Sequence, residues 1–492
     1  MDQPEPEQSR RPVFSDRVAV NGVYTPLTLS ADGVIRWSEG GQRSLTVEKE
    51  VLGFATDGSK LEIRTVVEGG GGILCFGSRG ALVRKNFVFL FSSEDSQKLL
   101  CLKLREFIDS LGRPKRLYVF VNPFGGKKSA SKIFSDQVKP LLEDADIQLT
   151  LQETKYQLHA KEVAKTMDLS KYDGIVCVSG DGILVEIVNG LLERGDWETA
   201  IKTPLGVVPA GTGNGMAKSL LDSVGEPCAV FNAVLAIIRG HKRPLDVTTI
   251  LQGETKFFSV LMLAWGLIAD IDIESEKYRW MGSARLDFYG LQRVFSLRKY
   301  NGRISFVPAP GFEGYGEPTS YKSETTSKQN VGGPTEVEPV KLQRHGYQGP
   351  DSDLHIMDWR TINGPFVSVW LHNVPWGSEN TMAAPQAKFS DGYIDLIIMR
   401  DCPKLALLSL MGELNNGNHV NSPYVTYLKV KAFILEPGPL AEDPTREGII
   451  DSDGEVLARG KGTYKCDQKT LMAYDKFQLA VDQGLATLFS PL

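Results

Sequence analysis

The stretch "VSGDGILVEIVNG", residues 178–190, decides the fold of this chain. It closes an apolar run that begins at Gly174, turns on Gly180 and Gly182 with Asp181 between them, and continues with apolar residues at helical spacing. Those helical positions are Leu184, Ile187, Val188 and Leu191. A strand, a tight glycine turn and an amphipathic helix in this order predict a βα unit, with Asp181 at the amino end of the helix.

An aspartate at the start of a helix has two interpretations. Its carboxylate is a favoured N-cap, because it accepts hydrogen bonds from the first free backbone amides. It can also take a proton from a substrate hydroxyl or hold a magnesium ion beside a phosphate. The turn itself leaves both interpretations of Asp181 open, and the neighbouring loops bear on the choice.

Two further glycine loops follow predicted strands in the same part of the chain. "NPFGGKK", residues 122–128, follows "LYVFV", and "PAGTGNGMA", residues 209–217, follows "LGVVP". The carboxyl ends of parallel strands share one edge of a sheet, so the three loops should face one crevice. Glycine lets backbone N–H groups approach a phosphate, and the following helix adds its positive end. Any one loop could be a plain turn, but together they predict a polyphosphate site.

The chain around these loops divides into two patterns. "LYVFV", "IQLTL", "GIVCV", "LGVVP" and "LDVTTI" alternate with helical segments, which predicts a three-layer α/β nucleotide-binding domain with a parallel sheet at residues 113–249. Later strands, from "GRISFVP" to "YLKVKAFIL", have little helix between them and predict an antiparallel β domain at residues 250–492. Within it, residues 310–358 are rich in Gly, Pro, Ser, Thr and Glu, which predicts a mobile surface insertion.

The amino-terminal part has a third pattern. At residues 13–112, short alternating stretches such as "KLEIRTVV" and "NFVFLF" are followed by one helical segment, "SEDSQKLLCLKLREFIDSLG". We expect a small β domain closed by a helix, preceded by a disordered tail at residues 1–12. The order of elements resembles a pleckstrin-homology-like (PH-like) domain, which implies lipid-headgroup binding, although a packing or interaction module would have the same pattern.

Composition narrows the class of protein further. The net charge is -5, and no run of Lys and Arg suggests nucleic acid as a partner. The six cysteines are scattered without a Cys-x-x-Cys pair, which favours reduced thiols and a cytoplasmic protein over disulfides or zinc. The longest apolar run, residues 257–269, is shorter than a membrane span, so we expect membrane contact to be peripheral.

The three loop motifs together resemble the diacylglycerol-kinase catalytic superfamily. Within it, "LAWGLIADIDIESEKYRWMGSARLDF", residues 263–288, is similar to the sphingosine kinases, and the N-terminal extension is similar to the plant members. Ile183 stands where diacylglycerol and NAD kinases commonly have threonine. The resemblance implies a lipid kinase that uses ATP and Mg²⁺ to phosphorylate the primary hydroxyl of a sphingoid base, with a C-terminal β-sandwich that binds the lipid.

The resemblance also implies roles for individual residues. Asp181 would be the general base, Asp272 would bind the substrate, and Asp453 and Glu455 would hold magnesium. The implied ATP site consists of Asn122, Pro123, Gly125, Gly126, Thr154, Ser179, Gly180, Gly182, Glu186, Gly211, Thr212, Gly213, Asn214, Arg279, Arg285, Asp453, Gly454 and Glu455.

Other functions stay open at this point. A ceramide or diacylglycerol kinase would use the same chemistry on a neutral lipid. A catalytically silent protein that binds a nucleotide or a membrane would keep the loops without turnover, although the intact turn around Asp181 and the two arginines, Arg279 and Arg285, disfavour it. A soluble sugar or NAD kinase is disfavoured by Ile183 and the long apolar strands. The sequence also leaves a homodimer possible.

Overall fold

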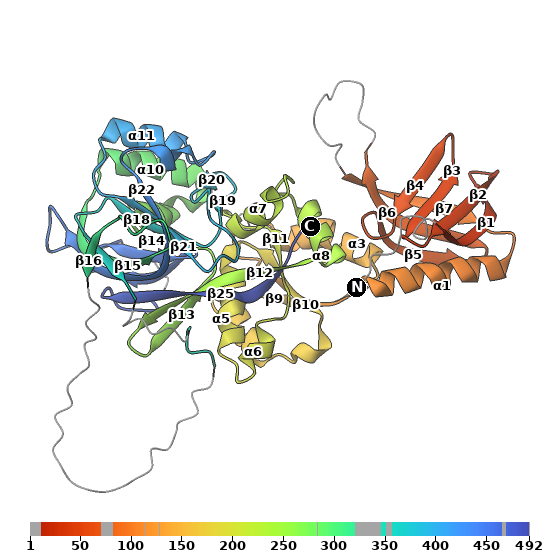
Figure 1. Ribbon diagram of the computed structural model, residues 1–492, viewed down its shortest axis with the longest axis horizontal. Coiled ribbons are helices and arrows are strands. Elements are labelled where there is room, and N and C mark those ends of the chain that lie inside the picture. The colour runs from red at the N-terminus through yellow and green to blue at the C-terminus, as the bar shows by residue number, and fades with distance from the viewer. Residues whose placement is uncertain are drawn as a thin grey trace, which may run out of the picture.

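The structure is a computed structural model in which the N-terminal sheet lies at one end, an α/β unit in the middle and a β-rich unit at the other end (Figure 1). It describes residues 11–69, 82–113, 115–126, 128–282, 284–319, 346–350, 357–464 and 469–491. The side chain of Arg279 is also outside the described part. The predicted disordered tail therefore falls almost entirely outside it, and Pro12 already begins the first strand.

The described N-terminal residues form a seven-stranded antiparallel sheet, as predicted, with the order β4-β3-β2-β1-β7-β6-β5. Its strands are β1 (Pro12–Val20), β2 (Val23–Ser30), β3 (Val34–Ser38), β4 (Gln42–Thr46), β5 (Val51–Asp57), β6 (Lys60–Glu68) and β7 (Leu82–Leu90). Helix α1 (Glu94–Ser110) follows, and its N-cap Ser93 accepts a hydrogen bond from the Ser96 amide. The helix buries Leu100, Leu104 and Ile108 in the same core as Trp37.

This sheet is docked on the α/β unit by both apolar and charged contacts. Leu52 and Val66 belong to a core shared with the neighbouring α/β helices and strands. The Arg64 guanidinium lies 2.6 Å from the carboxylate of Asp146. Gly53 is at the contact, where an added Cβ would come 2.6 Å from the Asp144 carbonyl oxygen. The N-terminal sheet thus packs against the α/β unit and is not an isolated domain on a linker.

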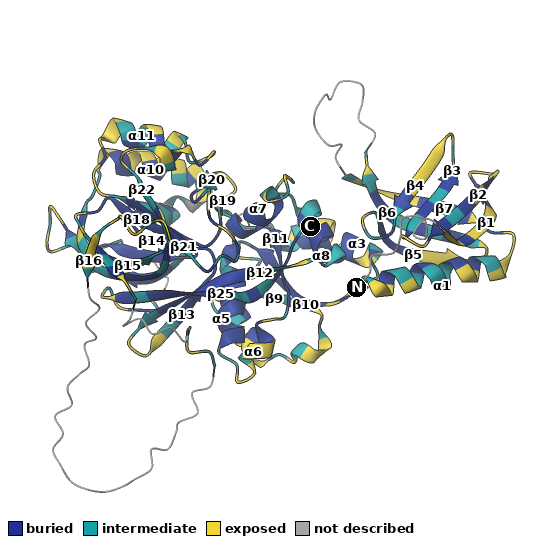
Figure 2. Cartoon of the chain, viewed as in Figure 1, coloured by how far each residue is buried: buried dark blue, intermediate teal, exposed yellow. Residues whose placement is uncertain are grey.

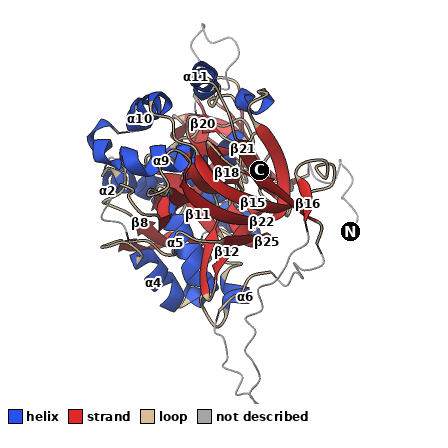
Figure 3. Cartoon of the chain, turned by 90° about the vertical axis from the view of Figure 1, so that its left-hand side faces the viewer, coloured by secondary structure: helices blue, strands red, loops and turns tan. Residues whose placement is uncertain are grey.

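The α/β unit contains parallel strands in the order β9-β8-β10-β11. Helices cover both faces of this sheet, which confirms the predicted α/β domain (Figure 3). The strands are β8 (Arg116–Val121), β9 (Gln148–Glu153), β10 (Gly174–Ser179) and β11 (Leu205–Pro209). The helices are α2 (Ala130–Ile133), a π-helical turn (Phe134–Val138), α3 (Lys139–Asp144), α4 (His159–Thr166), α5 (Asp181–Leu192), α6 (Trp197–Ala200), α7 (Gly215–Asp222) and α8 (Val230–Arg239).

One predicted parallel strand is wrong. "LDVTTI" lies in β12 (Lys242–Gln252), which pairs antiparallel with β13 (Thr255–Ser259) and with β25 (Phe477–Phe489). Alternation of apolar residues shows that a strand exists but not which way it runs. Its direction here follows from β25, the last strand of the chain, which also meets β11 in parallel at Leu488. The sheet of the α/β unit therefore continues into the C-terminal unit.

The C-terminal unit is β-rich and mainly antiparallel, as predicted. Its remaining strands are β14 (Met262–Gly266), β15 (Tyr300–Pro308), β16 (Glu317–Thr319), β17 (Trp359–Asn363), β18 (Ser368–His372), β19 (Trp376–Ser378), β20 (Thr381–Met382), β21 (Ile394–Met399), β22 (Thr426–Leu440), β23 (Ile449–Ser452) and β24 (Glu455–Arg459). Its helices are α9 (Leu267–Glu274), a 3₁₀ segment (Ser275–Met281), α10 (Ala284–Phe295), α11 (Lys404–Gly412) and a short 3₁₀ turn (Asn418–Asn421). Buried strands run through its centre, with exposed helical faces outside (Figure 2). None of the described helices has the length and apolarity of a membrane span.

Parts of the predicted mobile insertion at residues 310–358 are described, and they contact the rest of the chain. β16 pairs with β17, so residues 317–319 are a strand of the sheet. The Tyr347 ring packs against Trp197 in a tilted arrangement with 4.5 Å between centroids, and its amide donates to the Leu192 carbonyl over 2.7 Å. A tyrosine supplies enough apolar area to fix a polar segment against the α/β unit. Residues 320–345 and 351–356 lie outside the described residues.

Candidate active site

The three glycine loops meet one another through their glycines. An added Cβ at Gly211 would lie 2.3 Å from the Gly180 Cα, and one at Gly126 would lie 3.0 Å from the Gly211 carbonyl carbon. Real Cβ atoms do not come within 2.3 Å of backbone, so Gly211 must be glycine, and the tight contact and positive φ at Gly126 favour glycine there as well. The loops after β8, β10 and β11 therefore form one continuous backbone surface, at the sheet edge where α/β folds bind ligands.

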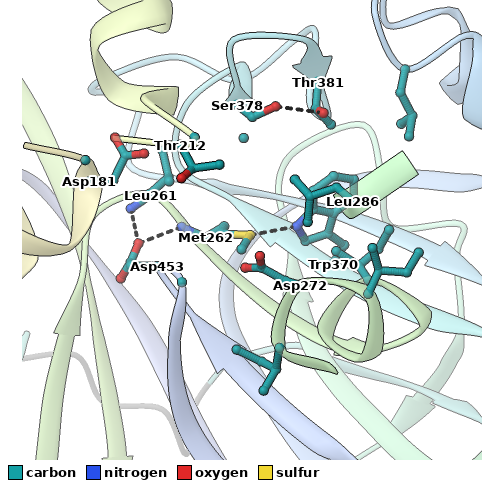
Figure 4. Close-up of a pocket in the computed structure, with 18 of the residues that line it drawn as sticks. Asp181, Thr212, Leu261, Met262, Asp272, Leu286, Trp370, Ser378, Thr381 and Asp453 are labelled. Atoms are coloured by element: carbon teal, nitrogen blue, oxygen red, sulfur yellow. Dashed lines mark hydrogen bonds between the residues drawn. The ribbon is translucent and has the colours of Figure 1, made fainter. Parts of the chain in front are cut away.

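This surface is one end of a cavity of about 390 Å³ that continues between α9, α10 and α11. Figure 4 shows Asp181 and Thr212 on one side of it and Asp272, Leu286 and Trp370 on the other. The predicted site residues that line it are Asn122, Gly125, Gly126, Gly180, Asp181, Gly182, Glu186, Gly211, Thr212, Gly213, Asp272, Arg285, Asp453, Gly454 and Glu455. Four predicted site residues do not line the cavity: Pro123 and Asn214 in the first and third loops, Ser179 at the end of β10, and Thr154, which follows β9.

Asp181 begins α5 and is held by the next helix of the sheet. One carboxylate oxygen accepts the Gly215 amide over 2.9 Å and the other accepts the Met216 amide over 3.0 Å. The residue is only 9% exposed, yet it lines the cavity. Burial raises the pKa of Asp181, and the two backbone amides oppose that rise. Asp181 is therefore not an N-cap of its own helix; its carboxylate is aimed across the turn at the start of α7.

Two predicted nucleotide residues have structural partners in these loops. Glu186 accepts the Leu158 amide over 2.9 Å and the Ala160 amide over 3.0 Å, so its carboxylate caps the start of α4. Asn214 has a left-handed backbone with φ of 58°. Its side chain accepts the Gly211 amide over 2.8 Å and donates to Glu379 over 2.6 Å. Both residues fix the shape of the loops that surround the cavity.

Asp453 and Glu455 come from the turn between β23 and β24. Asp453 accepts the amides of Leu261 and Met262 over 2.6 and 2.9 Å, and burial raises its pKa to about 6. Glu455 accepts a hydrogen bond from the Gln157 side chain over 2.8 Å. Within the described part of the chain, no three acidic, His or Cys side chains gather as metal ligands. One Asp453 oxygen thus accepts two backbone amides, and the other accepts the Ser452 hydroxyl over 3.2 Å.

Helices α9 and α10 place Asp272 and Arg285 at the cavity wall. The Arg285 guanidinium lies 4.0 Å from the Asp272 carboxylate and donates to the Ser275 hydroxyl over 3.0 Å. Behind Asp272 lies Asp451 of β23, which is fully buried. Burial and the Asp272 carboxylate raise the pKa of Asp451 well above its usual range. The sequence does not identify Asp451, because it is a single acidic residue within a short strand and belongs to no recognisable motif.

Other lining residues were also missed. Trp370 donates from its indole N–H to the Met262 sulfur over 3.0 Å, and Ser378 donates to Thr381 over 2.9 Å (Figure 4). The Glu379 amide donates to the Gly213 carbonyl over 2.8 Å, so the β19–β20 hairpin rests on the third glycine loop. These residues are far from the glycine loops in sequence, and no local motif marks them. The apolar end is lined by Leu267, Ile268, Ile271, Leu286, Ile397, Met399, Leu407, Leu410, Met411, Leu414 and Val425.

Comparison with known proteins agrees with this geometry. The family model described as the diacylglycerol kinase catalytic domain matches residues 116–250, and the one described as the YegS C-terminal NAD kinase beta sandwich-like domain matches residues 353–472. The fold and cavity thus define a lipid kinase of the diacylglycerol-kinase type.

Individual relatives narrow the class of lipid kinase. Sphingosine kinase 1 of Arabidopsis thaliana is 64% identical over 492 residues, covering 99% of this chain and 99% of that protein. Sphingosine kinase 1 of Homo sapiens is 36% identical over 70% of this chain and 87% of that protein. Ceramide kinase of Homo sapiens is 30% identical over 73% of this chain and 67% of that protein. The chain belongs to the sphingosine kinase family.

Proposed function

We propose that this kinase transfers the γ-phosphoryl group of Mg-ATP to the primary hydroxyl of a sphingoid long-chain base, with Asp181 as the general base. The observation that carries the proposal is that one continuous cavity joins Asp181 and the glycine loops to an apolar sleeve. A phosphate-binding end and a lipid-binding end are both needed for a lipid kinase. Sphingosine, sphinganine and phytosphingosine all have the required hydroxyl, amine and chain.

The described residues fit a nucleoside triphosphate. The close contact between Gly180 and Gly211 leaves no side chain between the loops, so backbone N–H groups of the glycine loops can meet phosphate oxygens. Glu455 would hold Mg²⁺ together with those oxygens, and the ion would neutralise charge on the transferring group. Arg285 lines the same cavity and would add positive charge.

Asp181 would accept the hydroxyl proton as the bond to phosphorus forms. Its two oxygens are fixed by the Gly215 and Met216 amides, so the carboxylate needs little rearrangement to reach a substrate. Such positioning is the main contribution an enzyme makes to phosphoryl transfer. General-base catalysis adds about 10²- to 10⁴-fold in typical enzymes.

The other end of the cavity supports the choice of lipid. A sphingoid base has a protonated amine next to its hydroxyl, whereas ceramide has a neutral amide. Asp272 lies on the cavity wall beyond Asp181 and can pair with that amine. The apolar residues of α9 and α11, among them Ile271, Leu407 and Met411, would hold the hydrocarbon chain.

The substrate assignment is tested by kinetics on a panel of sphinganine, phytosphingosine, sphingosine, ceramide and diacylglycerol. We expect the free bases to be phosphorylated at least about tenfold faster than the neutral lipids, because only they can form a charged pair. Asp272→Asn should raise KM for the bases and leave KM for ATP unchanged. Equal rates on ceramide, or equal KM changes for both substrates, would contradict this assignment.

Peripheral membrane contact is the second part of the proposal. Trp280, Phe295 and Leu405 are 83%, 64% and 83% exposed, on or next to the helices α10 and α11 that enclose the apolar end of the cavity. An exposed apolar surface above a lipid cavity suits a bilayer from which the substrate enters. Sedimentation with phosphatidylcholine vesicles should retain the wild type and lose a Trp280→Ala/Leu405→Ala variant. If both sediment equally, this surface is not the contact.

The N-terminal sheet and α1 have the element order of a PH-like domain, which is our proposal for residues 13–112. The described order, seven antiparallel strands followed by one helix, supports it. Because the sheet shares a core with the α/β unit, we assign it a structural role first.

A further inference from the structure

Two hydroxyl groups of the β19–β20 hairpin line the cavity. Ser378 donates to the Thr381 hydroxyl oxygen over 2.9 Å, and both residues are part of the cavity wall (Figure 4). The Ser378 oxygen is itself occupied, since it accepts the Asn380 amide over 3.4 Å. Within the described part of the chain, the half-buried Thr381 hydroxyl accepts one bond and donates to no protein acceptor. A hydroxyl can donate as well as accept, so Thr381 has a donor left for a ligand.

The hairpin fixes Thr381 between the two ends of the cavity. On one side, the Glu379 amide donates to the Gly213 carbonyl over 2.8 Å, and an added Cβ at Gly213 would lie 3.4 Å from the carboxylate of the proposed base. On the other side, the Met382 amide donates to the carbonyl of Leu414, which belongs to the apolar lining, over 2.6 Å. The Thr381 hydroxyl is therefore held where the head group of a bound lipid ends and its hydrocarbon chain begins.

Sphingoid bases differ in their polar groups at this point of the molecule. Each has the primary hydroxyl, an amine on the second carbon and a hydroxyl on the third, but phytosphingosine has a further hydroxyl on the fourth carbon. The amine and the 3-hydroxyl are on neighbouring carbons, so the two oxygens of Asp272 can accept both. The 4-hydroxyl lies at the start of the chain, and burying it without a hydrogen-bond partner would weaken binding.

We propose that Thr381 is a specificity-determining residue that donates a hydrogen bond to the 4-hydroxyl of phytosphingosine. Because Ser378 donates to the Thr381 oxygen, the Thr381 proton must point away from Ser378 and is free for the substrate. Sphinganine has a methylene group at the fourth carbon and gains nothing from this donor. The inference rests on the proposed function, because it assumes that the primary hydroxyl lies at Asp181 and the chain in the apolar end.

The test measures kcat/KM for phytosphingosine and for sphinganine in Thr381→Val and Thr381→Ser. Valine keeps the shape of threonine without the hydroxyl, whereas serine keeps the hydroxyl. We expect Thr381→Val to lower the ratio of phytosphingosine to sphinganine about tenfold, as for the loss of one partner of a buried hydroxyl, with sphinganine within about twofold of the wild type. Thr381→Ser should keep the ratio within about twofold. Both bases are assayed on one preparation, so the ratio does not depend on the folded fraction.

Ile397→Val is the matched control, since it removes a methyl group from the apolar lining and no hydroxyl. It should affect both bases equally. An unchanged ratio in Thr381→Val would overturn the inference, as would an equal loss for both bases or a similar change of ratio in Ile397→Val. If the wild type phosphorylates neither base, the proposed function itself fails. A wild type that phosphorylates both, with a ratio insensitive to Thr381, contradicts the inference alone.

Discussion

At the scale of single residues, the site depends on backbone groups more than on side chains. Asp181 accepts two amides at the start of α7, Asp453 accepts two at the start of β14, and Glu186 caps α4. Each carboxylate thereby offsets the cost of its burial with hydrogen bonds. The carboxylate side chains fix the shape of the loops by accepting backbone N–H groups. Because the loops contact one another through glycines, no side chain fills the space where a phosphate would bind.

Gly211→Ala tests this arrangement of the loops. The added methyl would lie 2.3 Å from the Gly180 Cα, so the second and third loops must separate. We expect nucleotide affinity to fall at least about tenfold, measured by calorimetry with ADP, because the amides no longer converge on one phosphate group. Gly314→Ala is the control, since a Cβ there meets open space. Equal affinity in the two variants would show that the loop contact is not needed.

At the scale of elements, α9 and α10 are fixed by a buried ionic cluster. Asp270 of α9 lies 3.2 Å from Arg293 of α10 and 3.3 Å from Arg298, and it accepts the Tyr300 hydroxyl at 2.7 Å. Asp270 is 1% exposed and Arg293 is 4% exposed. Because α9 carries Asp272 and α10 carries Arg285, this cluster positions both sides of the polar cavity wall.

Arg293→Met should lower the free energy of unfolding by about 3 kcal/mol, because it leaves part of the Asp270 charge buried without its partner. Urea denaturation followed by tryptophan fluorescence measures the change. The control variant is Lys98→Met, which breaks the exposed pair with Glu94 and should leave the free energy of unfolding unchanged. A similar loss for both variants would mean that burial of the ionic cluster does not matter.

The elements of the site differ in how far the sequence predicts them. The three glycine loops are contiguous motifs after strands, so their residues and their common edge could be predicted. Met262 and Trp370 reach the cavity from antiparallel strands, where neighbours are set by pairing across the sheet. The prediction of the direction of β12 was wrong for the same reason, because its partner β25 comes from the end of the chain.

At the scale of the whole molecule, the N-terminal sheet and the α/β unit share one core. Leu52 and Val66 pack with residues of the α/β unit, and Arg64 pairs with Asp146 across the contact. The last strand, β25, similarly ties the α/β unit to the C-terminal sheet. The chain should therefore unfold with strong coupling between its parts, although the cavity lies between only two of them.

Gly53→Ala tests the N-terminal contact. The methyl group would come 2.6 Å from the Asp144 carbonyl and 2.8 Å from the Arg64 guanidinium, so β5 must move away from α3. We expect faster amide hydrogen exchange in α3 and β5, with kcat unchanged, because the glycine loops are not involved. Thr56→Ala, an exposed change on the same strand, should have no effect. Unchanged exchange in Gly53→Ala would mean that the sheet is not fixed there.

The most direct measurement for the account as a whole is kcat of Asp181→Asn with sphinganine at saturating ATP. If Asp181 is the general base, kcat should fall by at least about 10²-fold in a variant that circular dichroism shows to be folded, although its amide can accept only one of the two backbone N–H groups. A variant that keeps more than half of the wild-type kcat would contradict the assignment of Asp181, and with it the proposed mechanism.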